Sequence, residues 1–295
     1  MVDAVGVIGL GNAGGAVAGA LARKGSVIGF DLDEGRRAIA ASLGVECVSS
    51  IEAVTARTKR IMLSLPKPAI SIAVTKALTE GVNPPELIIE TSTVTPQTAQ
   101  TSHNICQAKG IAFVDAAIAG GVASMAAGKI TFFLGGSEAD KALARPILDL
   151  VADGIYDLGT IGAGMGTKVV NNGVMHALMV VLIEAFAMSN KLGVPSQTMI
   201  DILNREEGLL RPLVHRVQER MQQGNYQGGM SVTNARKDSV LALETAQQLG
   251  VPLFATLAAH TPYEIAEARD MGDLDYASLA TLWEEWADVS FKTEG

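Results

Sequence analysis

The sequence predicts an α/β fold in which a domain built on a parallel sheet precedes an all-helical domain. Short apolar runs alternate with helical patterns from Ala4 to Gly159, and the strand pattern ends after Gly164. The chain has 295 residues, whereas one domain usually holds about 100–200. Only 4% of the residues are aromatic, which disfavours an aromatic-rich β-sandwich. We therefore expect two domains of different class.

Six strands are expected in the first domain, each nearly all apolar, as in strands that helices cover on both faces. They are Ala4–Ile8, Val27–Asp31, Arg60–Leu65, Leu87–Thr91, Ala112–Ala116 and Ile130–Leu134. Helices are expected between them over Asn12–Lys24, Ala69–Glu80 and Gln97–Lys109. Pro68 and Pro96 lie near helix starts, where a missing N–H group costs least.

The second domain is expected to consist of helices separated by glycine and proline turns. It begins with a long helix that starts near Met165, and we place the domain boundary between residues 161 and 162. This helix contains a run of 15 mostly apolar residues, Val174–Met188. Because a bilayer span needs roughly 20 such residues, a buried helix is expected there and no membrane association.

Composition and charge exclude several classes of protein. With 48% hydrophobic and 18% charged residues, the chain is expected to be globular and not disordered. The net charge of −8 disfavours nucleic acid as a partner, because the surface would repel a phosphate backbone. Neither the two cysteines nor the four histidines show metal-ligand spacing, so no metal site is expected. Reduced cysteines and a start without a secretory pattern favour a cytoplasmic protein.

A glycine-rich loop follows the first expected strand. It reads Gly9-Leu10-Gly11-Asn12-Ala13-Gly14 and matches G-x-G-x-x-G between a strand and a helix. Gly9 permits a tight turn, Gly11 lets the backbone approach a pyrophosphate, and Gly14 allows close packing of helix and strand. The helix N-terminus also favours the negative charge of a pyrophosphate. The loop therefore predicts a dinucleotide-binding site.

The choice of dinucleotide depends on Asp31, which ends the second expected strand about 20 residues after the loop. A carboxylate at this place accepts hydrogen bonds from the adenosine ribose and repels a 2′-phosphate. NAD is therefore the expected cofactor, and NADP is less favoured. Arg36 and Arg37 lie about one helical turn further on, and a phosphate contact from either of them is the alternative that would permit NADP.

Five further segments follow the loop in a recognisable order. They are Ser64-Leu-Pro-Lys-Pro, Ser92-Thr-Val-Thr-Pro, Asp115-Ala-Ala-Ile-Ala-Gly-Gly, Gly162-Ala-Gly-Met-Gly-Thr-Lys-Val-Val-Asn-Asn and Lys237-Asp-Ser-Val-Leu-Ala. In these motifs, which span nearly the whole chain, the sequence resembles the β-hydroxyacid dehydrogenase family, the group of 3-hydroxyisobutyrate dehydrogenase. The resemblance implies a Rossmann-type NAD-binding domain over residues 1–161. It also implies a helical domain for substrate binding and oligomerisation over residues 162–295, with the active site between the two.

Lys168 is the expected catalytic residue. The resemblance implies that the lysine of this motif is the general acid/base. Independently, Lys168 and Asn172 are four residues apart and share a helix face, so an ammonium group and an amide can converge on one substrate oxygen. A partly desolvated lysine loses its proton more readily than one in water. Asn172 is therefore expected to contribute both to catalysis and to substrate binding.

The resemblance also implies contacts with a small carboxylate substrate and with the cofactor. The backbone at Ala119, Gly120 and Gly121 is expected to bind the substrate carboxylate, and Lys237 to reach the cleft and contact both substrate and cofactor. Further cofactor contacts are expected from a set of loop residues: Leu65, Pro66, Ser92 and Thr93. The family usually places serine where this chain has Ala119, and often an aromatic residue near Met230. These departures leave the identity of the substrate open.

The expected function is an NAD-dependent dehydrogenase that interconverts a small 3-hydroxy acid and its semialdehyde or oxo acid. A homodimer or homotetramer is expected, because the helical half is short and rich in Met and Ala. Two kinds of alternative stay open. One is another enzyme on the same scaffold, an imine reductase or a decarboxylating dehydrogenase. The other is a catalytically idle NAD-binding module used for assembly.

Overall fold

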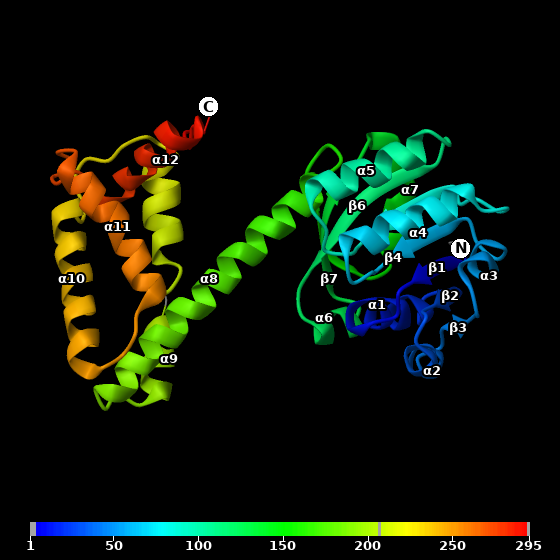
Figure 1. The fold of residues 1–295 in the computed structure, drawn as a ribbon, viewed down its shortest axis with the longest axis horizontal. Coiled ribbons are helices and arrows are strands. Elements are labelled where there is room, and N and C mark those ends of the chain that lie inside the picture. Colours follow the sequence, from blue (N-terminus) through cyan, green and yellow to red (C-terminus); the bar gives the residue numbers. More distant parts are fainter. Residues whose placement is uncertain (1–3, 206–207, 294–295) are drawn as a thin grey trace. The chain divides into compact units, whose positions relative to one another are not determined.

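The computed structural model describes residues 4–205 and 208–293. The chain folds into two compact units, Met1–Gly173 and Val174–Gly295. The first contains a sheet flanked by helices, and the second is helical (Figure 1). Helix α8 (Ala163–Lys191) contributes to both units. The units divide later than the predicted boundary at 161/162, because the first turns of α8 are bonded to the sheet and belong to the first unit.

The first unit is built on an eight-stranded sheet with the order β3-β2-β1-β4-β5-β6-β7-β8. All neighbouring strands are parallel except β6 and β7, which are antiparallel. The strands are β1 (Val5–Ile8), β2 (Val27–Phe30), β3 (Glu46–Cys47), β4 (Arg60–Leu63), β5 (Leu87–Glu90), β6 (Ala112–Ala119), β7 (Ile130–Gly135) and β8 (Ala152–Asp157). The expected α/β class with a Rossmann-type sheet is confirmed.

Two strands were not expected. Strand β3 has only two residues, too few to show an alternating pattern. Strand β8 reads Ala-Asp-Gly-Ile-Tyr-Asp, and its aspartates and glycine are typical of turns. It forms because it pairs with β7, where the Tyr156 ring packs on Phe133 with ring centroids 5.9 Å apart. Tertiary pairing has overridden local propensity here.

Helices cover both faces of this sheet. They are α1 (Asn12–Ala22), α2 (Glu34–Ser42), α3 (Ile51–Thr55), α4 (Pro68–Glu80), α5 (Pro96–Gln107), α6 (Val122–Ala126) and α7 (Glu138–Leu148). One apolar core contains Val7 of β1 with Leu21 of α1, and another contains Ile8 with Leu78 of α4. Neighbouring residues of β1 therefore face opposite cores. The carboxyl ends of β1, β2, β4 and β5 meet at one edge, the usual binding edge of such sheets.

The second unit consists of the remainder of α8 and several further helices. They are α9 (Ser196–Asn204), the π-helix η1 (Leu213–Met221), α10 (Val232–Leu249), α11 (Phe254–Ala268), the 3₁₀-helix η2 (Tyr276–Leu279) and α12 (Ala280–Ala287). Buried Asp275 lies 3.3 Å from Arg216 and 3.4 Å from Arg220. Glu184 of α8 accepts hydrogen bonds from the amides of Ala255 and Thr256 at the start of α11. These two carboxylates connect helices that are distant in sequence.

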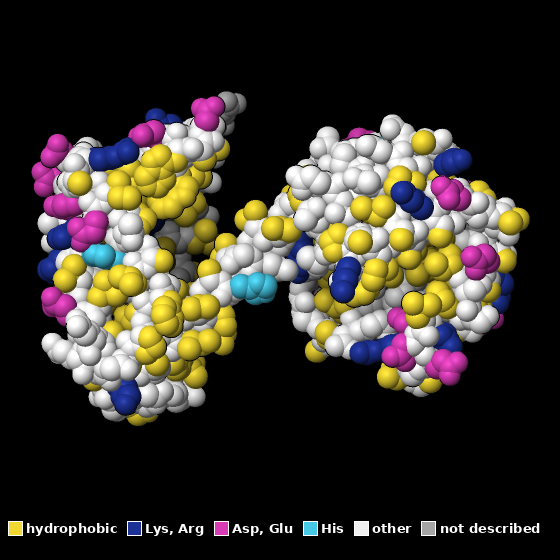
Figure 2. Space-filling view, viewed as in Figure 1, with side chains coloured by type: hydrophobic (Ala, Val, Ile, Leu, Met, Phe, Trp, Pro, Cys, Tyr) yellow, Lys and Arg dark blue, Asp and Glu magenta, His cyan; other side chains and the backbone are white. Residues whose placement is uncertain are grey.

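The apolar part of α8 differs from its prediction as a buried helix. Only 6% of its most hydrophobic 18-residue window is buried, and Figure 2 shows apolar side chains along its surface. By length and composition alone this helix is apolar enough to cross a membrane. Met175, Met179 and Ile183 recur every four residues and are 49%, 56% and 55% exposed. The helix is apolar on more than one face, so the helices of its own unit cover only part of it.

Candidate active site

The glycine loop connects β1 to α1 and lies against the end of β4. Gly9 has a φ of +94°, and a Cβ atom there would lie 2.1 Å from the carbonyl oxygen of Ser64. A Cβ atom on Gly14 would lie 2.1 Å from the carbonyl oxygen of Gly9. Gly11 precedes α1 and supplies no side-chain cap. The first amides of α1 are therefore left to bind an anion, as at other phosphate-binding helix N-termini.

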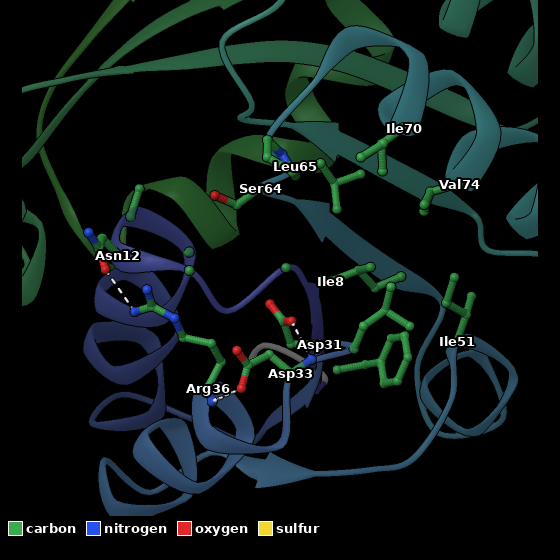
Figure 3. Close-up of a pocket in the computed structure, with 17 residues that line it drawn as sticks. Ile8, Asn12, Asp31, Asp33, Arg36, Ile51, Ser64, Leu65, Ile70 and Val74 are labelled. Atoms are coloured by element: carbon green, nitrogen blue, oxygen red, sulfur yellow. Dashed lines mark hydrogen bonds between the residues drawn. The ribbon is translucent and has the colours of Figure 1, made fainter.

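A cavity of about 530 Å³ opens beside this loop. We call it the larger cavity, because a smaller one adjoins it. Most of the loop residues expected at the cofactor line it, namely Gly9, Gly11, Asn12, Ala13, Gly14, Asp31, Leu65 and Pro66. Figure 3 shows a second side made of apolar residues, among them Ile8, Ile51, Ile70 and Val74. These residues were not predicted. Ile70 and Val74 are four residues apart on α4 and therefore share one face of this helix. This spacing was the only feature of the sequence that pointed to them.

Charged and polar side chains gather on the opposite side of the larger cavity (Figure 3). The Asp31 carboxylate accepts hydrogen bonds from the amide of Leu10 at 2.7 Å and from the amide of Asp33 at 2.9 Å. Arg36 Nη1 donates to Asn12 Oδ1 at 2.7 Å. The side chain of Leu10 itself is buried in the core, so this residue takes part through its backbone. Asp31 and the glycine loop are thus held together by hydrogen bonds.

A smaller cavity of about 270 Å³ adjoins the larger one, with which it shares Ala13, Ser64, Leu65 and Pro66. Its other lining residues are Thr91, Ser92, Thr93, Ile118, Met125, Lys168 and Asn172. The structure therefore brings Lys168 and Asn172 of α8 together with Ser92 and Thr93, which follow β5. All of these residues belong to the first unit.

The smaller cavity contains a lysine whose pKa is lowered by burial. Lys168 is half-buried, and burial lowers its pKa below the ordinary value of 10.5. In the same cavity, Ser92 Oγ accepts a hydrogen bond from the Leu65 amide at 2.7 Å. The Ser92 amide in turn donates to the buried Glu90 carboxylate at 2.9 Å. Ser92 is thus fixed by hydrogen bonds, and burial shifts the lysine toward its uncharged form.

Other predicted site residues lie outside both cavities. Ala119 is half-buried at the end of β6, and Gly120 and Gly121 are exposed just beyond it. Lys237 belongs to α10 of the second unit, where it is 62% exposed and pairs with Asp238 at 2.9 Å. From the segment around the glycines, Ile118 and Met125 line the smaller cavity instead. Neither was predicted, because an apolar residue at the end of a strand or in a short helix carries no motif.

Comparisons with known proteins identify the family of this chain. Residues 4–162 match the model of the NAD-binding domain of 6-phosphogluconate dehydrogenase. Residues 162–283 match the model described as the NAD-binding region of NADP-dependent 3-hydroxyisobutyrate dehydrogenase. Together with the glycine loop and the lysine-lined cavity, these matches define a nicotinamide-dinucleotide-binding oxidoreductase. More specifically, the chain belongs to the β-hydroxyacid dehydrogenase family.

Individual relatives cover nearly the whole chain. The 2-(hydroxymethyl)glutarate dehydrogenase of Eubacterium barkeri is 30% identical over 290 residues, which cover 97% of this chain and 96% of the relative. Human mitochondrial 3-hydroxyisobutyrate dehydrogenase is 28% identical, covering 93% of this chain and 85% of the relative. Among the relatives are thus dehydrogenases of different hydroxy acids.

Solved structures show the same fold. That of Mycobacterium tuberculosis 3-hydroxyisobutyrate dehydrogenase with L-serine is 28% identical, with a TM-score of 0.66 and coverage of 96% of this chain and 99% of that one. An imine reductase from Pseudomonas sp. has a TM-score of 0.85 at 19% identity, covering 95% of this chain and 99% of that one. At so low an identity the imine reductase shows a shared fold and nothing about the reaction.

Proposed function

We propose that this chain is a dehydrogenase that interconverts a small 3-hydroxy acid and the corresponding semialdehyde or oxo acid, with Lys168 as its general acid/base. The observation that carries the proposal is the smaller cavity, in which Lys168 and Asn172 adjoin the glycine-loop cavity. The hydroxy acids named for its relatives support the substrate class. The family sets the class of reaction, and this geometry supports Lys168 and Asn172 as the side chains that perform it.

In the oxidative direction, the substrate hydroxyl lies against Lys168 and Asn172. Uncharged Lys168 accepts the hydroxyl proton on Nζ while the carbon–hydrogen bond breaks and a carbonyl forms. The bound dinucleotide supplies the hydride acceptor. Asn172 donates a hydrogen bond from its amide to the same oxygen and holds it in place. In the reductive direction, the lysine ammonium returns the proton. Burial favours the uncharged lysine that oxidation needs.

For the acid group of the substrate, we propose that the backbone of Gly120 and Gly121 binds the carboxylate. Both residues are exposed to solvent. Ile118 and Met125 give the adjoining cavity an apolar wall, and its volume of about 270 Å³ suits a small molecule. Ala119 brings no hydroxyl to this segment. The proposed substrate is thus a short carboxylate with a modest apolar or hydroxylated substituent.

For the cofactor, we propose NAD in preference to NADP. The Asp31 carboxylate faces the larger cavity, where it would repel a 2′-phosphate. Arg37 donates to the backbone carbonyl of Asp31 at 2.6 Å and pairs with Glu34, while Arg36 is bonded to Asn12. The test is the ratio of kcat/KM for NAD to that for NADP, which should exceed one. Asp31→Asn should lower this ratio, and a wild-type preference for NADP contradicts the proposal.

The decisive experiment is a steady-state assay with 3-hydroxyisobutyrate, glycerate, 4-hydroxybutyrate and threonate, each with NAD and with NADP. We expect cofactor reduction with at least one 3-hydroxy acid and no release of CO₂. Cofactor binding without reduction across the whole panel would favour an idle assembly module. CO₂ release would favour a decarboxylating dehydrogenase, and reduction of a cyclic imine without oxidation of any hydroxy acid would favour an imine reductase.

We further propose a homodimer or homotetramer. The exposed apolar stripe Met175, Met179 and Ile183 on α8 supports this, since such surfaces usually mark contacts with another chain. Light scattering should give at least twice the monomer mass, and Met179→Asp should lower it. A monomer at micromolar concentration contradicts the proposal. The cytoplasmic location expected from the sequence stays a prediction. Imaging of the tagged chain in cells would test it.

A further inference from the structure

Asp115 is a fully buried carboxylate to which the proposed reaction assigns no role. It lies in β6, and its side chain reaches the start of α8. One carboxylate oxygen accepts a hydrogen bond from the amide of Gly162 at 2.9 Å. The other accepts one from the amide of Met165 at 2.8 Å. A single side chain therefore binds two backbone groups that follow it in sequence by 47 and 50 residues.

These two hydrogen bonds replace an ordinary helix cap. The first amides of a helix have no partner within it and usually bind the side chain of the preceding residue. The residue before α8 is Gly162, which has no side chain. Asp115 therefore provides the acceptor from the sheet. Its negative charge also lies at the positive end of the helix, which is the favourable arrangement.

The proposed acid/base lies in the helical turn that follows the anchored amides. Lys168 follows Met165 by three residues, so it lies one helical turn beyond the anchored amide and on a similar face. Asn172 lies one further turn along. A shift of α8 relative to the sheet would therefore move both residues against Ser92 and Thr93, which line the same cavity.

The Asp115 carboxylate is closely packed against two glycines. A Cβ atom on Gly164 would lie 2.3 Å from the carbonyl oxygen of Phe133 and 2.9 Å from Asp115 Oδ2. A Cβ atom on Gly135 would lie 2.6 Å from Asp115 Oδ1. Two glycines thus allow backbone and carboxylate to approach at distances that any other residue would block. The start of α8 is therefore closely packed against the sheet.

We infer that Asp115 is a positioning residue for proton transfer, because it fixes the start of α8 and thereby the place of Lys168 in the smaller cavity. The inference rests on the proposed role of Lys168. Asp115 does not touch the reacting atoms; it acts through the helix. An error of about 1 Å in the place of a catalytic group can cost about a hundredfold in rate, so the anchor is expected to matter for turnover.

Glu90 provides a matched control. It lies opposite Asp115 in the register of β5 and β6 and is also fully buried. Burial raises the pKa of Glu90 to about 6, against hydrogen bonds from Ser71 and Ser92 that lower it. Its carboxylate therefore holds Ser71 and Ser92, whereas that of Asp115 holds α8. Removing either charge disturbs the same part of the sheet, but only one removal loosens the helix.

The test is a double-mutant cycle on the full chain, measured as kcat at saturating substrate and cofactor. Asp115→Asn should lower kcat about tenfold to a hundredfold in the wild-type background. It should lower kcat less than about twofold in the Lys168→Ala background, where there is no lysine left to misplace. Glu90→Gln should change kcat by the same factor in both backgrounds. The Kd of the cofactor should stay within about threefold throughout.

The outcomes separate two failures. Equal costs of Asp115→Asn in both backgrounds would show a merely structural role and overturn the inference. Near-normal turnover of Lys168→Ala alone would instead overturn the proposed function. Thermal unfolding and cofactor binding establish that each variant is folded. If Asp115→Asn does not fold, Asp115→Ser, which keeps one acceptor oxygen without the charge, enters the same cycle with the same expectations.

Discussion

The two adjoining cavities of the first unit differ in the kind of side chain that lines them. The larger one combines an apolar side, which includes Ile70 and Val74, with the glycine loop and Asp31. The smaller one combines Lys168 and Asn172 with two serines and two threonines. In the proposed reaction, the first cavity binds the cofactor by apolar contacts and backbone amides, and the second holds the lysine that exchanges a proton. We therefore expect changes in the first to alter cofactor affinity and changes in the second to alter turnover.

The largest effect is expected from Lys168→Ala. Loss of the general acid/base should lower kcat at least about a hundredfold, while the Kd of the cofactor stays within about threefold. Steady-state kinetics and a fluorescence titration with the reduced cofactor measure the two quantities. Lys191→Ala, at the exposed far end of the same helix, is the control and should leave both unchanged. If kcat of Lys168→Ala stayed close to the wild-type value, Lys168 would not be the general acid/base.

The pH dependence of turnover provides the next test. Burial lowers the pKa of Lys168 below 10.5. Oxidation needs the uncharged lysine, so its kcat should rise about tenfold per pH unit below that pKa and level off above it. Reduction needs the ammonium form, so its rate should fall as pH rises through the same value. Lys168→Arg, which stays protonated, should abolish the plateau. If the kcat of Lys168→Arg showed the same rise and plateau with pH, the titration would belong to another group.

Val74→Asp should affect the larger cavity alone. A carboxylate placed on the apolar side costs about 1–3 kcal/mol where the ligand covers it, which corresponds to an increase of about 5- to 150-fold in the Kd of the cofactor. At saturating cofactor, kcat should not change. Val82→Asp, at a position 94% exposed in the same unit, is the matched control. If Val74→Asp lowered kcat and left the Kd of the cofactor unchanged, the larger cavity would not act on cofactor affinity alone.

The smallest effect is expected from Ala119→Ser, which places a hydroxyl in the segment proposed to bind the carboxylate. One net hydrogen bond contributes about 0.5–1.5 kcal/mol, so the KM of the preferred hydroxy acid should fall about two- to tenfold. The Kd of the cofactor should not move. Ser124→Ala, at an exposed position of the same segment, is the control. An unchanged KM across the whole panel would place carboxylate recognition elsewhere.

Much of the first unit was predictable because its signals are local. Each of the six expected strands was found, since strands buried on both faces are continuous apolar runs. Their ends shifted by one or two residues, apart from β6, which continues to Ala119. The continuation depends on pairing with antiparallel β7. The exposed length of α8 was not predictable, because an apolar sequence does not reveal what covers it.

The sequence by itself determined the class of fold, the family and the two features that local spacing encodes: the glycine loop at its strand–helix junction, and the Lys168–Asn172 pair on one helix face. The tertiary structure decided which distant segments meet. It placed Ile51 and Val74 on the apolar side of the larger cavity, and it joined Asp115 to the start of α8. The reason is physical: a turn or a helix face depends on neighbours within a few residues, whereas these contacts depend on how eight strands are ordered and packed.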